Sequence, residues 1–203
     1  RFFYTKNCCI IASMEAHKAK LYVITGPSGV GKGTVLNKFF EHNKGDIIYS
    51  VSCTTRSARP GEQDGVNYFF ISKEEFENAI KNNEFLEWAK YSDNCYGTKK
   101  SFVLENLKKG ISVVLEIETE GAKKVMREYP DCVSIFITPP NMDELEKRLR
   151  GRKTECEEAI LKRLEAVKRE LKEAKNYKYT IVNNKVESAF EELQEIYEKE
   201  KTS

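Results

Sequence analysis

The fold of this chain is narrowed most by a short glycine-rich loop between a predicted strand and a predicted helix. The apolar run Leu21–Thr25 precedes the loop, and a helical pattern over Thr34–Glu41 follows it. The loop consists of Gly26, Pro27, Ser28, Gly29, Val30, Gly31, Lys32, Gly33 and Thr34. Glycines let backbone N–H groups curl around an anion, the helix N-terminus adds a positive dipole end, and Lys32 supplies a mobile charge. The loop therefore predicts a phosphate-binding site, because a plain strand-to-helix turn rarely has this spacing together with both flanks.

The residue after Lys32 departs from the usual phosphate-loop pattern. That position normally holds a serine or threonine whose hydroxyl ligates Mg²⁺. Here it is Gly33, and the hydroxyl comes one residue later, at Thr34. Adenylate kinases have the same Gly-Lys-Gly-Thr ending and still use Mg²⁺. The departure is therefore compatible with nucleotide binding, but it leaves a direct hydroxyl ligand to the metal open.

Length and composition argue against several classes of protein. A chain of 203 residues can form one compact unit or a core with inserted lids, and its net charge of +2 argues against a nucleic-acid partner. No apolar run has the length of a membrane span, and the six cysteines form no Cys-x-x-Cys pair. We expect a cytoplasmic protein with no zinc site, no membrane contact and no obligate protein partner. Residues 1–13 are a poor signal peptide, and we expect an upstream or non-native extension, with a short targeting segment as the alternative.

Apolar runs that alternate with helical patterns predict an α/β fold with a central parallel sheet flanked by helices. Near-continuous apolar runs are typical of strands buried on both faces. The expected strands are Leu21–Thr25, Ile47–Cys53, Ser112–Ile117, Val133–Thr138 and Thr180–Asn183. The expected helices are Thr34–Glu41, Glu120–Glu128, Met142–Gly151, Glu155–Lys175 and Val186–Lys201. After the second strand, an alternating strand over Val66–Ile71 and a serine-capped helix over Ser72–Asn82 predict a small inserted subdomain.

Two arginines in this insertion could bind a second phosphate. Arg56 and Arg59 lie three residues apart beside a Pro-Gly turn, so that two guanidinium groups could converge on one anion. Tyr68 and Tyr96 could donate phenol hydroxyls to the same phosphate. A solvated basic loop with two packing tyrosines is the alternative interpretation.

Charged residues later in the chain could serve a metal ion and a transferring phosphoryl group. Glu116 ends an apolar strand, where a carboxylate could hold the water shell of Mg²⁺ or merely be solvated. Two expected helices and the segment between them contain Arg148, Arg150, Arg152 and Arg163, and arginines on a closing lid could stabilise migrating negative charge. Helical arginines more often form surface ion pairs worth little, so the pattern alone does not assign them.

The chain resembles the guanylate kinases from Leu21 to its C-terminal helix, on several separated motifs. These motifs are Gly26–Lys32, Ser52–Arg59, Gly61–Tyr68, Glu84–Ala89, Tyr96–Thr98, Arg148–Arg152 and Ile181–Asn183. The resemblance implies a P-loop kinase domain over residues 14–203. Its core would span 20–50, 101–142 and 172–203, with a GMP-binding insertion over 51–100 and an arginine-rich lid over 143–171.

The resemblance also implies roles for individual residues. The loop Gly26–Thr34 would bind ATP together with Arg152 and with Asn183, which would lie by the adenine. Guanine would be read by Ser52, Glu87, Thr98 and Glu118, and the GMP phosphate would be held by Arg56, Arg59, Tyr68 and Tyr96. The residues implied in catalysis are Lys32, Arg56, Arg148, Arg152 and Arg163. Mg²⁺ would be the cofactor, with Glu116 as a water-mediated ligand.

Three acidic residues depart from the family pattern. Glu116 and Glu118 stand where the family usually has aspartates, and Glu120 stands where it commonly has glutamine.

We expect phosphoryl transfer from ATP to GMP, giving ADP and GDP, in purine nucleotide metabolism. One alternative is a non-enzymatic guanylate-kinase-like interaction module, as found in membrane-associated scaffolds; such modules keep the fold but lose the phosphate loop. The other alternative is a monophosphate kinase for another base.

Overall fold

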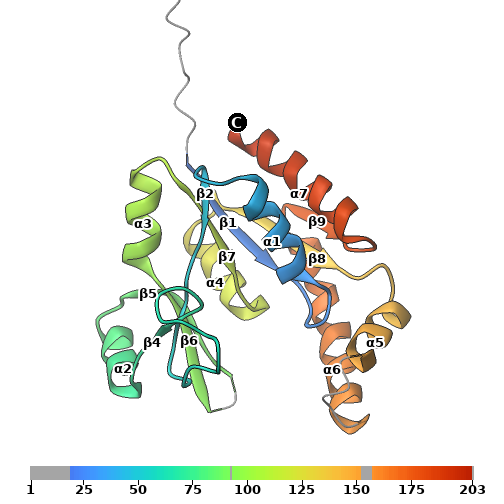
Figure 1. Cartoon of the computed structure of the whole chain (residues 1–203), viewed down its shortest axis with the longest axis horizontal. Helices are drawn as coiled ribbons and strands as arrows, with labels where there is room; N and C mark the ends of the chain where they lie inside the picture. Colours follow the sequence, from blue (N-terminus) through green and yellow to red (C-terminus); the bar gives the residue numbers. More distant parts are fainter. Residues whose placement is uncertain (1–18, 92, 152–156, 203) are drawn as a thin grey trace, which may run out of the picture.

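The structure is a computed structural model that describes residues 19–91, 93–151 and 157–202 (Figure 1). The predicted extension over residues 1–13 lies outside the described residues, and so does Arg152. Among the described residues, no helix is both long enough and apolar enough to span a bilayer.

A five-stranded parallel sheet forms the centre of the molecule. Its strands are β1 (Leu21–Thr25), β2 (Ile47–Tyr49), β7 (Ser112–Glu116), β8 (Val133–Thr138) and β9 (Tyr179–Val182). They lie in the order β2-β7-β1-β8-β9, with β1 hydrogen-bonded on one side to β7 and on the other to β8. The parallel arrangement brings the carboxyl ends of all five strands to one edge. The predicted central parallel sheet is confirmed.

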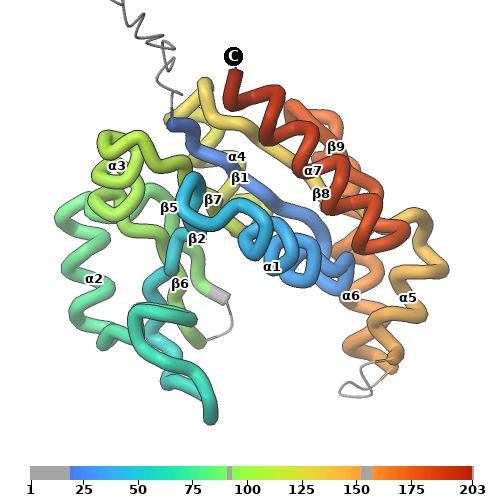
Figure 2. Tube along the Cα trace, turned by 45° about the horizontal axis from the view of Figure 1, so that its top comes forward, coloured from blue at the N-terminus to red at the C-terminus, as the bar shows by residue number. Residues whose placement is uncertain are grey.

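Helices cover both faces of this sheet, as the continuous apolar strands require. Helices α1 (Lys32–His42) and α7 (Val186–Lys201) pack against Tyr22 and Ile24 on one face. Helices α3 (Lys100–Lys108) and α4 (Thr119–Glu128) pack against Leu21 and Val23 on the other. Figure 2 shows α1 and α7 together on the near side of the sheet. Alternate residues of β1 thus supply two separate cores.

A second, mixed sheet is made by residues 53–99. It contains β3 (Cys53–Thr54), β4 (Phe69–Phe70), β5 (Phe85–Tyr91) and β6 (Asn94–Lys99) in the order β4-β3-β6-β5. Helix α2 (Lys73–Lys81) packs on it through Phe76, whose ring centroid lies 4.5 Å from that of Phe85. The expected serine cap is present: Ser72 accepts from the Glu75 backbone and the Glu75 carboxylate accepts from the Ser72 backbone.

A pair of helices lies at the opposite end of the molecule from the second sheet (Figure 1). Helix α5 (Met142–Gly151) and helix α6 (Glu157–Glu170) share a small apolar core of their own. Asn141 caps α5, because its side-chain oxygen accepts from the Glu144 backbone at 2.8 Å. The 3₁₀ helix η1 (Leu171–Asn176) then leads into β9.

Three expected elements differ from the structure. The strand expected over Ile47–Cys53 is divided, because the chain leaves the main sheet after Tyr49 and joins the second sheet at Cys53. The helix expected over Glu155–Lys175 is α-helical only to Glu170, after which it tightens into η1. The strand expected over Val66–Ile71 is confined to Phe69–Phe70, because Gly65 at φ 73° and bonds from Val66 and Asn67 back to Gln63 form a turn.

Candidate functional site

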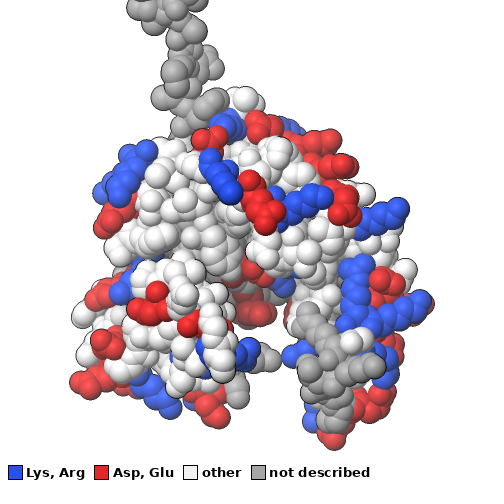
Figure 3. All heavy atoms as spheres, viewed as in Figure 1, with Lys and Arg blue, Asp and Glu red and all other residues white. Residues whose placement is uncertain are grey.

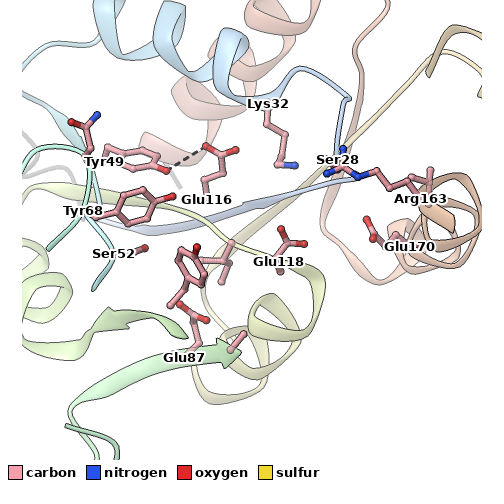
Figure 4. A pocket seen from close by; sticks show the side chains of 16 residues that line it. Ser28, Lys32, Tyr49, Ser52, Tyr68, Glu87, Glu116, Glu118, Arg163 and Glu170 are labelled. Carbon is pink, nitrogen blue, oxygen red and sulfur yellow. Dashed lines mark hydrogen bonds between the residues drawn. The ribbon is translucent and has the colours of Figure 1, made fainter. Parts of the chain in front are cut away.

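A cleft of about 490 Å³ lies at the carboxyl ends of the parallel strands, between the second sheet and α6. Figure 3 shows the molecule hollowed between the part that carries α2 and the part that carries α5 and α6, with acidic atoms inside the hollow. This edge is where open parallel sheets bind their ligands. The lining residues are Ser28, Lys32, Tyr49, Ser52, Asn67, Tyr68, Glu87, Ala89, Tyr96, Glu116, Ile117, Glu118, Arg163, Ala166, Val167 and Glu170 (Figure 4).

The glycine-rich loop joins β1 to α1 at one end of this cleft. Gly26 lies against the carbonyl of Ile137 on β8, so closely that a Cβ atom would overlap it. Gly31 adopts φ 91°, a left-handed conformation that disfavours other residues, and begins α1 as its N-cap. The Lys32 ammonium donates to the carbonyl oxygens of Gly26 at 2.6 Å and Pro27 at 3.3 Å. The lysine is therefore held across its own loop, with its charge at the cleft wall.

Asn183 and Arg148 anchor the loop from behind. The buried Asn183 amide donates to the Val30 carbonyl at 2.7 Å. The Arg148 guanidinium donates to the carbonyls of Asn183 at 3.1 Å, Val30 at 3.4 Å and Asn184 at 3.3 Å. These bonds join α5, the loop after β9 and the glycine-rich loop. Neither side chain lines the cleft described above.

Glu87 is a buried carboxylate at the opposite end of the cleft. It lies on β5 directly across from Thr98 on β6, and the Thr98 hydroxyl donates to its Oε1 at 2.8 Å. Only 5 % of Glu87 is exposed, and this burial raises the pKa of its carboxyl, although Thr98 and the charge of Lys124 act in the opposite direction. A carboxylate so placed needs further hydrogen-bond donors, which a ligand in the cleft could supply.

Arg56 is oriented by an acid within its own loop. Glu62 accepts two hydrogen bonds of 2.9 Å from the two terminal nitrogens of Arg56, and its Oε2 also accepts from the Arg59 backbone at 2.7 Å. The bonds from Arg56 hold the pKa of Glu62 at about 2. The Arg56 guanidinium also lies over the ring of Tyr68, 5.5 Å from its centroid. Tyr68 and Tyr96 pack edge to face and line the cleft.

Some of the predicted site residues line the cleft, and others do not. The cleft wall includes Ser28, Lys32, Ser52, Tyr68, Glu87, Tyr96, Glu116, Glu118 and Arg163. Four further predicted residues contact or flank that wall without lining it: Thr98 through Glu87, Arg56 through Tyr68, and Arg148 and Asn183 through the loop. Arg59 is exposed in the turn beside Arg56, and Arg152 lies outside the described residues.

Acidic side chains dominate the middle of the cleft. Glu116 ends β7, Glu118 follows it, and Glu170 approaches from α6 (Figure 4). Burial raises the pKa of Glu170, and the negative charge of Glu118 adds to that effect while Lys32 opposes it. The Tyr49 phenol donates to Glu116 Oε2 at 3.3 Å.

These oxygen donors fit Mg²⁺ bound mainly through water and nucleotide phosphates. Mg²⁺ prefers oxygen ligands and usually keeps several waters while taking one or two carboxylates. Glu116 and Glu118 lie in the same cleft as Lys32 and could contact such a hydrated ion. Within the described part of the chain, no cluster of three or more acidic, histidine or cysteine residues could enclose a metal by itself.

Sequence reasoning missed Tyr49, Asn67 and Glu170, which also line the cleft. A signal for Glu170 was present, because it follows Arg163 by seven residues, which places both on one face of α6 two turns apart. Tyr49 ends β2 beside Glu116 of the neighbouring strand, so its position could have been found from the carboxyl edge of the sheet. Asn67 gave no signal, since it lies in the turn that replaced an expected strand.

Comparison with known proteins gives a consistent result. The family model described as guanylate kinase matches residues 18–200. A guanylate kinase of Streptococcus pneumoniae (strain ATCC BAA-255 / R6) is 49% identical over 185 residues, which cover 91% of this chain and 89% of the relative. A guanylate kinase of Prochlorococcus marinus (strain NATL2A) is 48% identical over 174 residues, covering 86% and 93%. The crystal structure of guanylate kinase from Anaplasma phagocytophilum superimposes with a TM-score of 0.74 at 34% identity, covering 92% of this chain and 88% of the other.

Proposed function

The chain belongs to the guanylate kinase family, and we propose that it transfers the γ-phosphoryl group of ATP to GMP, giving ADP and GDP with Mg²⁺ as cofactor. The observation that carries the proposal is the arrangement of one cleft. A lysine on a phosphate loop lies at one end, and a buried carboxylate suited to a base with two donors lies at the other. A nucleoside monophosphate kinase needs a phosphate site and a base site in one cleft. The proposed reaction belongs to purine nucleotide metabolism.

ATP would bind at the glycine-rich loop, Gly26–Thr34. Its backbone N–H groups and the N-terminus of α1 suit the phosphates, and Lys32 would leave the loop carbonyls to contact them. Asn183 and Arg148 would support this site from behind by holding the Val30 carbonyl. For these two residues, the contacts favour positioning of the loop over direct contact with adenine or phosphoryl oxygens.

GMP would bind between the second sheet and the centre of the cleft. Glu87 would accept from guanine N1–H and N2–H₂, with hydroxyl contacts from Ser52 and Thr98 and a second carboxylate from Glu118. The GMP phosphate would lie against Tyr68 and Tyr96, where Arg56 and Arg59 can reach it from the adjoining turn.

The chemistry would rest on positioning and charge. The phosphate of GMP is already an anionic nucleophile, so the protein has no proton to remove, and holding two phosphates in line supplies much of the rate enhancement. Lys32 and Arg163 would offset the negative charge that spreads over the transferring group. Mg²⁺, when bound, would neutralise charge on the phosphate oxygens, with Glu116 contacting its water shell.

We also propose that the chain is divided into functional subdomains. Residues 51–100 would form the GMP-binding insertion, residues 143–171 the lid, and the remainder of 14–203 the core. The separate apolar clusters of the second sheet and of α5 and α6 support this division. We propose the cytoplasm as the compartment, because Cys53, Cys95 and Cys132 are unpaired thiols.

Product analysis tests the proposed reaction. Purified protein incubated with ATP, GMP and Mg²⁺ is expected to form ADP and GDP in equal amounts, and EDTA is expected to stop both. A chromatogram that shows ADP without GDP would mean ATP hydrolysis and would refute GMP as the acceptor. Absence of both products under these conditions would refute the kinase assignment.

Alanine in place of Arg56 or Arg59 is expected to impair GMP binding selectively. A hydrogen bond to a charged group contributes about 1.5–3 kcal/mol, so the KM for GMP should rise roughly tenfold to a hundredfold. The KM for ATP should stay within about twofold, because the phosphate loop lies elsewhere in the cleft. Arg127→Ala, at an exposed position on α4, is the matched control for loss of a guanidinium. Equal rises in both KM values would move the arginines out of the acceptor site.

Acidification is expected to weaken GMP recognition through Glu87. Burial raises the pKa of this carboxyl, so it takes up a proton above the usual pH range for glutamate and then no longer accepts both guanine donors. The kcat/KM for GMP should therefore fall as the pH is lowered through that raised pKa. Because this pKa is raised in the folded state, protonation of Glu87 stabilises the fold, so activity should fall on acidification while the contribution of this group to Tm rises.

The variant Glu87→Gln separates this effect from titration of the substrate, whose phosphate has a second pKa of about 6. In this variant, the fall in kcat/KM that comes from protonation of the GMP phosphate should remain. The fall that comes from protonation of Glu87 should be absent. Identical profiles for the two proteins would show that Glu87 does not control GMP recognition.

A further inference from the structure

The buried carboxylate of Glu87 occupies space that a side chain at residue 121 would need. Gly121 lies in the first turn of α4. A Cβ atom on it would come within 2.7 Å of Glu87 Oε2 and 3.3 Å of Glu87 Cδ. Real Cβ atoms essentially never approach a heavy atom closer than 3.0 Å. A glycine at this position therefore allows the carboxylate to lie directly against the helix.

The backbone gives no other reason for a glycine here. Gly121 is not among the glycines with positive φ, so its conformation is open to any residue. Alanine is the better helix former, and glycine inside a helix weakens it. The room that this glycine leaves for Glu87 offsets its local cost.

The hydrogen bond from Thr98 opposes movement of the Glu87 carboxylate. Its Oε1 accepts from the buried Thr98 hydroxyl at 2.8 Å, while its Oε2 faces Gly121. The neighbouring residues on the same strand, Phe85 and Leu86, are 2 % and 0 % exposed, which fixes the strand beneath it. A methyl group at residue 121 would therefore turn the carboxylate out of its present plane or push it away from α4.

We propose that Gly121 is a positioning residue that determines specificity for GMP. By leaving the first turn of α4 without a side chain, it lets Glu87 present both oxygens in the orientation that guanine N1–H and N2–H₂ require. The proposal rests on the function proposed above, because it assigns to Gly121 the alignment of the base-reading carboxylate. Gly121 touches no substrate and acts only through Glu87.

Gly121→Ala is expected to raise the KM for GMP at least tenfold, since misalignment of a paired contact to a charged group removes most of its value. The KM for ATP should stay within about twofold, and the slow turnover of AMP should not change, because adenine lacks the donor pair. If Gly121 had only a structural role, the substitution would impair GMP binding, ATP binding and AMP turnover together. Ser188→Ala, at an exposed position on α7 that does not line the cleft, is the control and should leave the KM for GMP unchanged.

A double-mutant cycle shows whether the effect passes through Glu87. In the Glu87→Ala background there is no carboxylate to displace, so Gly121→Ala should cause no further loss of kcat/KM for GMP. If Gly121→Ala alone does not fold, Glu87→Ala should restore folding by removing the overlap, and failure to do so would contradict the contact.

The outcomes separate this proposal from the proposed function. An unchanged KM for GMP in Gly121→Ala, or an equal loss in both backgrounds, would overturn the role of Gly121 while leaving GMP kinase activity intact. A wild-type protein with no GMP kinase activity would instead overturn the function on which it rests.

Discussion

Replacement of Lys32 by alanine is expected to lower kcat at least a hundredfold and to leave the fold intact. The ammonium donates to the Gly26 and Pro27 carbonyls, so it is already placed at the loop where the phosphates of ATP would bind. Loss of one such charge contact in a closed site costs about 3–4 kcal/mol of transition-state stabilisation. Steady-state assays with saturating ATP and GMP measure the loss, and thermal melting checks the fold.

Lys38→Ala is the matched control for this substitution. Lys38 lies on the same helix, α1, and pairs with the exposed Glu187 at 3.4 Å on the outside of the molecule. Its loss should have little effect on turnover, because exposed ion pairs contribute little. Turnover of Lys32→Ala within about threefold of wild type would remove the lysine from the phosphate site.

Glu87→Gln is expected to abolish most of the preference for GMP over AMP. Guanine offers two adjacent donors and a carboxylate accepts both, whereas the glutamine amide replaces one acceptor by a donor. A site built to bond a polar edge rejects an analogue lacking that edge by roughly 10⁴-fold, because its buried groups remain unpaired. The ratio of kcat/KM values for GMP and AMP in the two proteins measures the effect.

The stability of this variant provides a second readout. Burial disfavours the charged form of Glu87, so the neutral glutamine should keep or raise the Tm while GMP turnover falls. If the variant keeps the full GMP-to-AMP ratio, the base-reading carboxylate lies elsewhere. Glu118 is then the first residue to test, because it lines the same cleft.

Local signals in the sequence were sufficient to predict the sheet and the glycine-rich loop between β1 and α1. Apolar runs such as Leu21–Thr25 and Val133–Thr138 are buried on both faces, so their composition carries the whole signal. Gly31 takes a left-handed φ that the motif itself requires. Such features depend on neighbours in sequence, and for that reason they can be read without the fold.

Contacts between distant segments could not be read in this way. The division of Ile47–Cys53 between two sheets depends on which partners are available, Val114 for Ser50 and Phe69 for Ser52, and composition does not specify them. The arrangement of Glu87 against Gly121 joins β5 to α4 across the fold. The Arg148 and Asn183 bonds to the Val30 carbonyl also link segments far apart in sequence. Residue types suggested function there, but only the structure shows which atoms meet.

Turnover of the wild-type protein with GMP, AMP, UMP and CMP, each with ATP and Mg²⁺ in a coupled ADP-release assay, tests the central claim most directly. We predict a kcat/KM for GMP that exceeds those for the other three by several orders of magnitude, since only guanine presents the donor pair that Glu87 accepts. A preference for another nucleotide would identify a different monophosphate kinase. If none of the four nucleotides supports ADP release, that result would contradict the enzyme assignment and favour a binding module with this fold.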